Sequence, residues 1–387
     1  MQFFKPFIAL TVLVLSLSFP VCANTWVDDF AHELKATAKK KKLPGLAFVL
    51  VAPNQPTRFE FYGRTEKSGT SIDKETVFRL ASVSKTFTAV FIAQQVKEKK
   101  LTWKNSLQEL LPDYKFDNYI NTPILLQHLI GQSTGFIPNA YDNLIEANYK
   151  LPRVLEHLEN LDSLCRPGIC YTYQNTFFGV LEEYYRQQKT TFADEITKSI
   201  IVPLKMPTAS VGRNALMASK KWAKPHAAID KNEWVSVRVK DNYYKYSPAA
   251  GVNASAADME IWLKAMLLEY PDIIDKNMIE TLTKPRVKTK RELYRSEWRK
   301  QLTDAHYGLG WRIYNVDDIE IIYHGGWVQG YRADIAFSPQ LGVGYALLMN
   351  AESNSINKLT ATFWKDQIEA HKIVTLADIK KVNTSHY

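Results

Sequence analysis

The sequence lacks the signatures of several large classes of protein. Its 387 residues contain only three cysteines, and no cysteine or histidine spacing matches a structural zinc site. It contains no glycine-rich phosphate loop and no recognisable nucleic-acid module. Internal repeats and long low-complexity linkers are also missing, which excludes solenoids and largely disordered chains. The sequence therefore implies neither a metal nor another cofactor, and no nucleic-acid partner.

Long apolar runs are equally scarce, because the one at residues 7–17 is too short to span a bilayer comfortably. Lys5 precedes this run and Val21-Cys22-Ala23 follows it, which is the pattern of a secretory signal peptide. We expect cleavage after Ala23 and a periplasmic or secreted protein, with a retained anchor as the alternative. Removal of residues 1–23, which contain one lysine and no acidic residue, would leave 364 residues and lower the net charge from +9 to +8.

The positive charge would attract anionic cell-wall polymers or a membrane surface. Because the lysines are scattered and the apolar content is ordinary, a basic surface without a dedicated partner is the simpler interpretation. The sequence leaves the oligomeric state open. After loss of Cys22, Cys165 and Cys170 remain in a chain bound for an oxidising compartment, so we predict a disulfide across the Pro167-Gly168 turn. Such a short loop would contribute only about 2 kcal/mol through chain entropy, so its role is to fix local geometry.

The segment Ser82-Val83-Ser84-Lys85 carries the clearest chemical signal. Residues 77–80 have strand character and apolar residues then recur at helical spacing, so the motif opens a helix. Residues three apart share a helix face, which brings the Lys85 amine to the Ser82 hydroxyl. A lysine with a lowered pKa can take the hydroxyl proton, and unpaired N–H groups at the helix start favour a developing oxyanion. The motif is weak alone, since it also occurs at Ser71–Lys74 and Ser355–Lys358.

Strand character at both ends of the chain surrounds a helical middle. Residues 46–51 and 59–62 form a strand pair, and four more strand-like segments lie between residues 311 and 349. We therefore predict an α+β fold with one antiparallel sheet built from both ends of the chain and flanked by terminal helices near 26–42 and 358–371. The expected domains are 24–100 with 295–376 for the sheet and 101–294 for a helical insertion, followed by a tail at 377–387.

Two further motifs accompany Ser82 and Lys85, one at Pro167-Gly168 with Tyr171–Asn175 and one at His324-Gly325-Gly326-Trp327. Together they make the chain resemble the class C β-lactamases, with the related penicillin-binding D-alanyl-D-alanine carboxypeptidases and β-lactamase-fold esterases. The resemblance runs from about residue 43 to residue 350. Its supporting stretches are Leu80–Thr88, Ala250–Val252, Ser255–Met259 and Tyr307–Trp311.

The resemblance implies a β-lactamase/transpeptidase-like fold and a role for each matching residue. Ser82 would be the acylated nucleophile, Lys85 its proton partner and Tyr173 a second proton carrier. Asn175 would contact a substrate amide, and the backbone N–H groups of Ser82 and Trp327 would form the oxyanion hole. Tyr-x-Asn also occurs at Tyr119–Asn121 and Tyr141–Asn143, but only Tyr173 follows the Pro-Gly turn. We expect the Lys85 cation to lower the pKa of the Tyr173 phenol.

The chain departs from the family at His324-Gly325-Gly326, where the β-lactamases usually have Lys-Thr-Gly. Gly325 and Gly326 would let an extended substrate lie along the strand. Histidine is mostly neutral at pH 7, so His324 cannot act as a fixed cation for a substrate carboxylate. Binding of a small molecule or a peptidoglycan peptide is implied, and β-lactam, D-amino-acid peptide and ester substrates all remain open.

Two alternatives remain. Gly131-Gln132-Ser133-Thr134-Gly135 matches the nucleophile elbow of α/β-hydrolases, which would make Ser133 the nucleophile of an esterase. That elbow needs a preceding strand, whereas residues 125–130 have helical character. The second alternative is a non-catalytic protein that binds wall peptide or a protein partner. Such a protein would have no chemical need for Ser82, Lys85, Tyr173 and Asn175 together.

Overall fold

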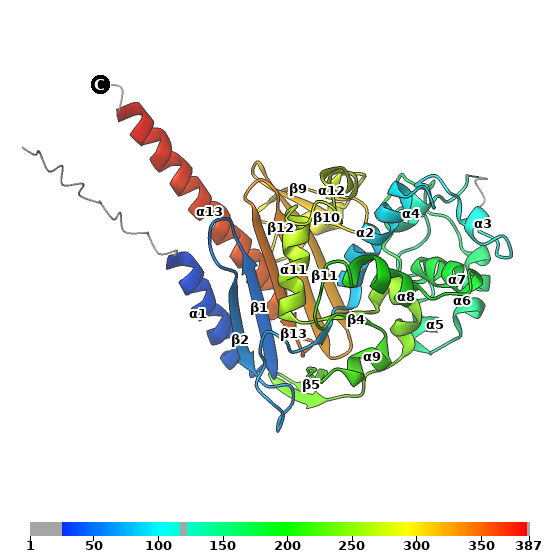
Figure 1. Ribbon diagram of the computed structural model, residues 1–387, viewed down its shortest axis with the longest axis horizontal. Helices are drawn as coiled ribbons and strands as arrows, with labels where there is room; N and C mark the ends of the chain where they lie inside the picture. Colours follow the sequence, from blue (N-terminus) through cyan, green and yellow to red (C-terminus); the bar gives the residue numbers. More distant parts are fainter. Residues whose placement is uncertain (1–24, 117–121, 385–387) are drawn as a thin grey trace, which may run out of the picture.

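The core of the protein is an eight-stranded sheet whose neighbouring strands are all antiparallel (Figure 1). The computed structural model describes residues 25–116 and 122–384, so the predicted signal peptide and the Tyr119–Asn121 motif lie outside it. In spatial order the strands are β2 (Arg58–Gly63), β1 (Gly45–Val51), β13 (Val343–Met349), β12 (Tyr331–Ser338), β11 (Ile319–Val328), β10 (Arg312–Val316), β9 (Leu302–Tyr307) and β8 (Val287–Lys288). Because β1 pairs with β13, the two ends of the chain complete one sheet, as predicted.

Helices cover both faces of this sheet. The terminal helices α1 (Thr25–Lys40) and α13 (Ser355–Thr384) lie side by side on one face (Figure 1). Side chains alternate between the faces of a strand, so Phe48 of β1 packs with Phe30 and Phe363 from these helices, whereas Ala47 and Val49 join the core on the other face. The sheet is therefore the middle layer of a sandwich.

The second half of the molecule is helical, and α2 (Ser84–Lys97) connects it to the sheet (Figure 1). Most of α2 is buried, which suits a helix packed on several sides. The other helices here are α3 (Leu107–Leu110), α4 (Leu126–Ile130), α5 (Asp142–Glu146), α6 (Leu151–His157), α7 (Gly179–Gln187), α8 (Phe192–Ile196), α9 (Arg213–Ala218), α10 (Ser247–Ala250) and α12 (Lys276–Thr283), with shorter helical turns η1 (Ala81–Val83), η2 (Leu158–Asn160), η3 (Thr176–Phe178), η4 (Thr197–Ile201), η5 (Asn242–Tyr246) and η6 (Lys290–Tyr294). Two small sheets complete the fold, β3 (Phe78–Arg79) with β7 (Val252–Ala254) and β4 (Ser210–Val211), and β5 (His226–Asp230) with β6 (Glu233–Ser236).

Two details differ from the expected boundaries. Helix α11 (Ala256–Met266) lies within the segment assigned to the helical insertion, yet it packs against β1 and β13 (Figure 1). Its Trp262 is buried and stacks on Phe87 of α2, so α11 lies against both the sheet and α2. The backbone of α13 stays helical to Thr384, so most of the tail expected at 377–387 is helix.

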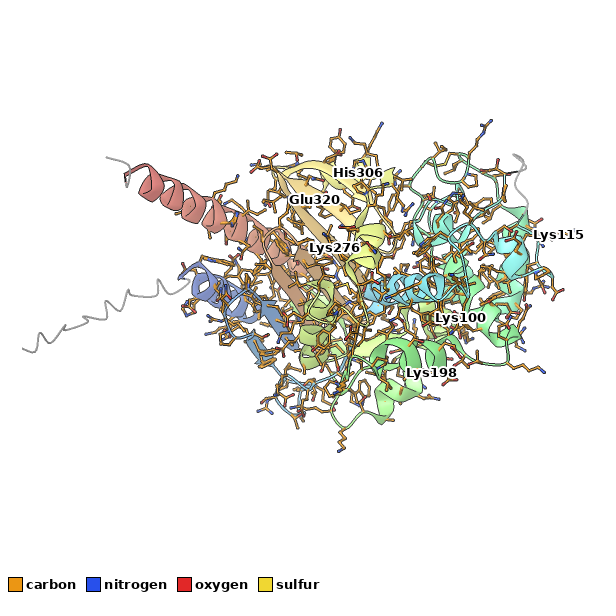
Figure 2. The ribbon with its side chains drawn as sticks, turned by 45° about the horizontal axis from the view of Figure 1, so that its top comes forward. Lys100, Lys115, Lys198, Lys276, His306 and Glu320 are labelled. Carbon is orange, nitrogen blue, oxygen red and sulfur yellow. A yellow bond between two sulfur atoms is a disulfide. The ribbon has the colours of Figure 1, made fainter. Side chains whose placement is uncertain are left out.

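The surface charge is distributed over the molecule. Figure 2 shows Lys100, Lys115 and Lys198 in the helical half, and His306 and Glu320 over the strands of the sheet. Within the described residues, no helix combines the length and apolar character needed to cross a membrane.

Candidate active site

Ser82 lies in the tight connection between β3 and α2, inside η1. Ala81 before it has φ of +50°, a left-handed conformation that is strained for a residue with a side chain. Strand β11 packs closely against the backbone at Ser82. A Cβ on Gly326 of this strand would lie 2.2 Å from the carbonyl oxygen of Leu80 and 3.2 Å from the nitrogen of Ser82. Only glycine allows the strand to approach the serine this closely.

Lys85 is fully buried and faces the serine. Its Nζ lies 3.4 Å from Ser82 Oγ, and it donates to Asn175 Oδ1 at 2.7 Å and to the carbonyl of Ala249 at 3.1 Å. Burial lowers the pKa of Lys85 to about 7, and this shift is opposed by Asp142 and assisted by Arg312. A substantial fraction of the lysine is therefore a neutral amine near pH 7, the form that accepts a proton.

Tyr173 and Asn175 reach the site on a loop that other loops hold in place. The side chain of Gln132 accepts from Gln174 N at 2.6 Å and donates to Gln174 O at 3.1 Å, so it clamps the backbone between the two residues. Asn139 N donates to the carbonyl of Tyr173 at 2.8 Å. The predicted disulfide between Cys165 and Cys170 closes the start of this loop.

Two basic side chains lie near the ring of Tyr173, with Lys85 Nζ at 4.9 Å and Arg312 Cζ at 5.5 Å from its centroid. The expectation of a lowered phenol pKa is nevertheless wrong. Burial raises the pKa of Tyr173, and the opposing effects of Arg312 and of a hydrogen bond with Ser82 do not reverse it. Tyr173 is thus protonated near neutral pH and can donate a proton.

His324 is completely buried on β11. Its Nδ1 lies 2.9 Å from the carbonyl of Gly325, which can only accept, so Nδ1 carries the proton and Nε2 accepts from Tyr307 OH at 3.1 Å. Burial and the charges of Arg312 and Lys85 hold the pKa of His324 well below its usual value. The imidazole is neutral, as expected, and it is not among the side chains that line the cleft, so direct contact with a substrate stays a prediction.

Two site residues were not found from the sequence. Arg312, only 9% exposed, lines the cleft, and its Nη2 donates to Tyr171 OH at 3.2 Å. Arg312 directly follows the Tyr307–Trp311 stretch that supported the family resemblance, and this position was the only sequence feature that could have indicated it. Asp142 accepts a hydrogen bond from Asn175 Nδ2 at 2.8 Å. In the sequence it appeared only as the middle residue of Tyr141–Asn143, one of the other matches to Tyr-x-Asn. Burial raises the pKa of Asp142.

These side chains open on a cleft of about 960 Å³. Ser82, Tyr173, Asn175, Asp142 and Arg312 line it together with Gly325, Gly326 and Trp327. Strand β10 pairs with β11 only from Ile319 to Tyr323, so among the described strands none covers this edge of β11 from Gly325 to Val328. A strand edge that no other strand covers suits an extended substrate.

The competing serines lie outside this arrangement. Ser133 follows α4 rather than a strand, and its backbone carbonyl accepts from Gly168 N at 2.7 Å in the loop that carries Tyr173. The lysines of the other two Ser-x-x-Lys motifs, Lys74 and Lys358, are exposed and do not line the cleft. A buried lysine beside a cleft serine therefore distinguishes Ser82.

The Beta-lactamase family model matches residues 28–367, so the chain belongs to the β-lactamase family. Among curated proteins, an unguisins hydrolase of Aspergillus campestris is 23% identical over 346 residues, covering 85% of this chain and 62% of the relative. Protein flp of Staphylococcus aureus is 23% identical over 361 residues, covering 88% of this chain and 65% of flp. The chain thus spans less than two thirds of the length of these relatives.

Solved structures show the same fold. A penicillin-binding protein homologue from Pyrococcus abyssi, described as octameric, has a TM-score of 0.76 at 20% identity, covering 87% of this chain and 76% of that one. D-amino acid amidase from Ochrobactrum anthropi, in complex with L-phenylalanine, has a TM-score of 0.68 at 16% identity, with 91% and 99% covered. The predicted β-lactamase/transpeptidase-like fold is confirmed, and an α/β-hydrolase fold built on Ser133 is excluded.

Proposed function

We propose that this protein is an exported serine hydrolase that forms an acyl-enzyme on Ser82. The observation that carries the proposal is the buried Lys85 amine, 3.4 Å from Ser82 Oγ and with a pKa of about 7. A base poised near the working pH is what nucleophile activation requires. The exported location rests on the signal-peptide pattern of residues 1–23.

Acylation would begin when the neutral Lys85 amine takes the Ser82 proton and Oγ bonds to the substrate carbonyl carbon. The carbonyl π electrons move to oxygen, and the resulting oxyanion is stabilised by the N–H groups of Ser82 and Trp327. Collapse of this intermediate breaks the bond to the leaving nitrogen or oxygen, which takes the proton of Tyr173. The Lys85 ammonium then returns a proton to Tyr173, so no net charge is left.

Hydrolysis of the acyl-enzyme repeats these steps with water as the nucleophile. The neutral Lys85 amine accepts the water proton, Ser82 Oγ leaves and takes the proton of Tyr173, and the Lys85 ammonium then returns a proton to Tyr173. Asn175 supports both stages, because its Oδ1 accepts from Lys85 while its Nδ2 is held by Asp142. Asn175 is therefore a positioning residue as well as the predicted contact for a substrate amide.

The substrate is a β-lactam, a D-alanyl peptide or an ester. Arg312 favours the first two, because a buried guanidinium in the cleft offers the fixed positive charge that His324 cannot provide. The fold neighbours include a penicillin-binding protein homologue and a D-amino acid amidase, which is compatible with amide substrates. His324 would not bind the substrate carboxylate itself. Its role would be to hold the Tyr307 hydroxyl in place beside the cleft.

The test is covalent labelling of the purified mature protein with a fluorescent penicillin and with a fluorophosphonate probe, followed by peptide mass analysis. We expect the adduct on Ser82, its loss in Ser82→Ala and its retention in Ser133→Ala. Turnover of penicillin would indicate a lactamase, and a trapped adduct a peptidase. The absence of labelling by both probes would contradict the proposal and favour the non-catalytic alternative.

A further inference from the structure

Trp327 is unusual among the large side chains of the cleft, because 62% of its surface is exposed. The indole is nevertheless held firmly: its Nε1 donates to Glu352 at 3.2 Å, and Glu352 also accepts from Gly330 N at 2.8 Å. The guanidinium of Arg332 lies 5.5 Å from the ring centroid. An immobilised but uncovered aromatic side chain in a cleft is typical of a contact for a bound molecule.

The neighbours of Trp327 define which part of the cleft it serves. In an antiparallel pair, residues two apart on a strand and their direct partners share a face. Gly325 and Trp327 therefore share a face with Asp334 and Arg332, their partners on β12. This is the face that carries Tyr323, the partner of Arg312 on β10.

The Tyr323 hydroxyl and the Asp334 carboxylate lie directly over Gly325 on this face. A Cβ at this position would lie 2.5 Å from Tyr323 OH and 2.9 Å from Asp334 Oδ1, so no other residue fits without movement. Tyr323 OH donates to Asp334 Oδ1 at 3.0 Å, and both residues line the cleft although Asp334 is only 3% exposed. A polar floor thus lies beside the indole, and Arg295, Asn354 and Asn357 line the same cleft.

We propose that Trp327 and the polar floor at Tyr323 and Asp334 form a subsite that selects a leaving group with an aromatic ring. This inference rests on the proposed function and names the substrate class of the same site. The leaving group belongs on this side because Arg312 continues the face toward Tyr173, which would protonate the leaving atom. The ring of the leaving group stacks on the open face of the indole, and its carboxylate pairs with Arg312.

The experiment uses dipeptides that share one acyl group and differ only in what leaves: N-acetyl-D-alanyl-D-phenylalanine and N-acetyl-D-alanyl-D-alanine. For the wild type we expect kcat/KM about tenfold higher for the aromatic leaving group. Trp327→Ala should bring this ratio close to one, and Trp327→Phe should retain most of it. Tyr149→Ala, a change of an exposed aromatic residue that does not line the cleft, should leave the ratio intact.

Calorimetric titration of Ser82→Ala with the same two dipeptides separates this proposal from the proposed function, because the variant cannot be acylated. Tighter binding of the phenylalanine dipeptide that is lost in Ser82→Ala/Trp327→Ala would support the subsite even if wild-type turnover were absent. Equal binding of the two dipeptides, or a ratio unaffected by Trp327→Ala, would overturn it. A further pair of dipeptides would keep the leaving group and differ in the acyl group. If Trp327→Ala changed kcat/KM only between the members of that pair, the proposal would also be overturned.

Discussion

The two halves of the proposed catalytic machinery are built in different ways. Ser82 and Lys85 lie one helical turn apart, and η1 and α2 alone set their relation. Tyr173 and Asn175 come from a loop about 90 residues further along the chain, and side-chain clamps and a disulfide position that loop. Local spacing therefore determines the first half, whereas tertiary contacts determine the second.

The largest effect is expected from Lys85→Met, which keeps an unbranched side chain of nearly the same length and removes the base. Because general-base catalysis contributes roughly 10²- to 10⁴-fold, acylation of Ser82 should slow by about a thousandfold. Stopped-flow measurement of probe labelling would give the rate. Lys74→Met removes the exposed lysine of an unused Ser-x-x-Lys motif and should have no effect, and equal losses in both variants would argue against a specific role for Lys85.

Gln132→Ala tests the second half of the site without touching a reacting group. It removes the two hydrogen bonds to the Gln174 backbone, so the Tyr173 hydroxyl should shift and kcat should fall by about 10- to 100-fold. Ser133→Ala is the matched control, since it lies next to Gln132 in the same loop. Circular dichroism melting would show whether the fold persists, and an unchanged kcat in a folded variant would mean that the clamp does not position Tyr173.

The pH dependence of kcat/KM should follow the Lys85 amine. Its pKa of about 7 means that the basic form is lost as pH falls through 7, so the rate should drop about tenfold for each pH unit below that value. Because Asp142 raises the pKa of Lys85, Asp142→Asn should move the inflection to lower pH. Glu156→Gln, a change of an exposed carboxylate on α6 that does not line the cleft, is the control. An inflection that stays fixed in Asp142→Asn would assign it to another group.

The contrast also explains what the sequence could predict. The strands at both ends of the chain have clear β patterns, and helical spacing brings Lys85 to Ser82, so the sheet and the proximity of these two side chains were predictable. Arg312 and Asp142 enter the site only through pairing between distant segments, which a local pattern does not encode. The pKa of Tyr173 depends on how deeply the folded chain buries the phenol, and a neighbouring cation alone suggested the opposite direction.

The smallest effect is expected from the disulfide. The bond joins residues only five apart, so Cys165→Ser with Cys170→Ser should lower the free energy of unfolding by about 2 kcal/mol. Its loop touches the site through Gly168 N, which donates to the carbonyl of Ser133, and Thr172 N, which donates to Gln132 O. We therefore expect kcat to fall less than in Gln132→Ala, because Gln132 would still clamp Gln174. Steady-state kinetics on the wild type and the double variant, with and without reductant, would measure this fall in kcat. A fall as large as that of Gln132→Ala would make the disulfide the main restraint on Tyr173.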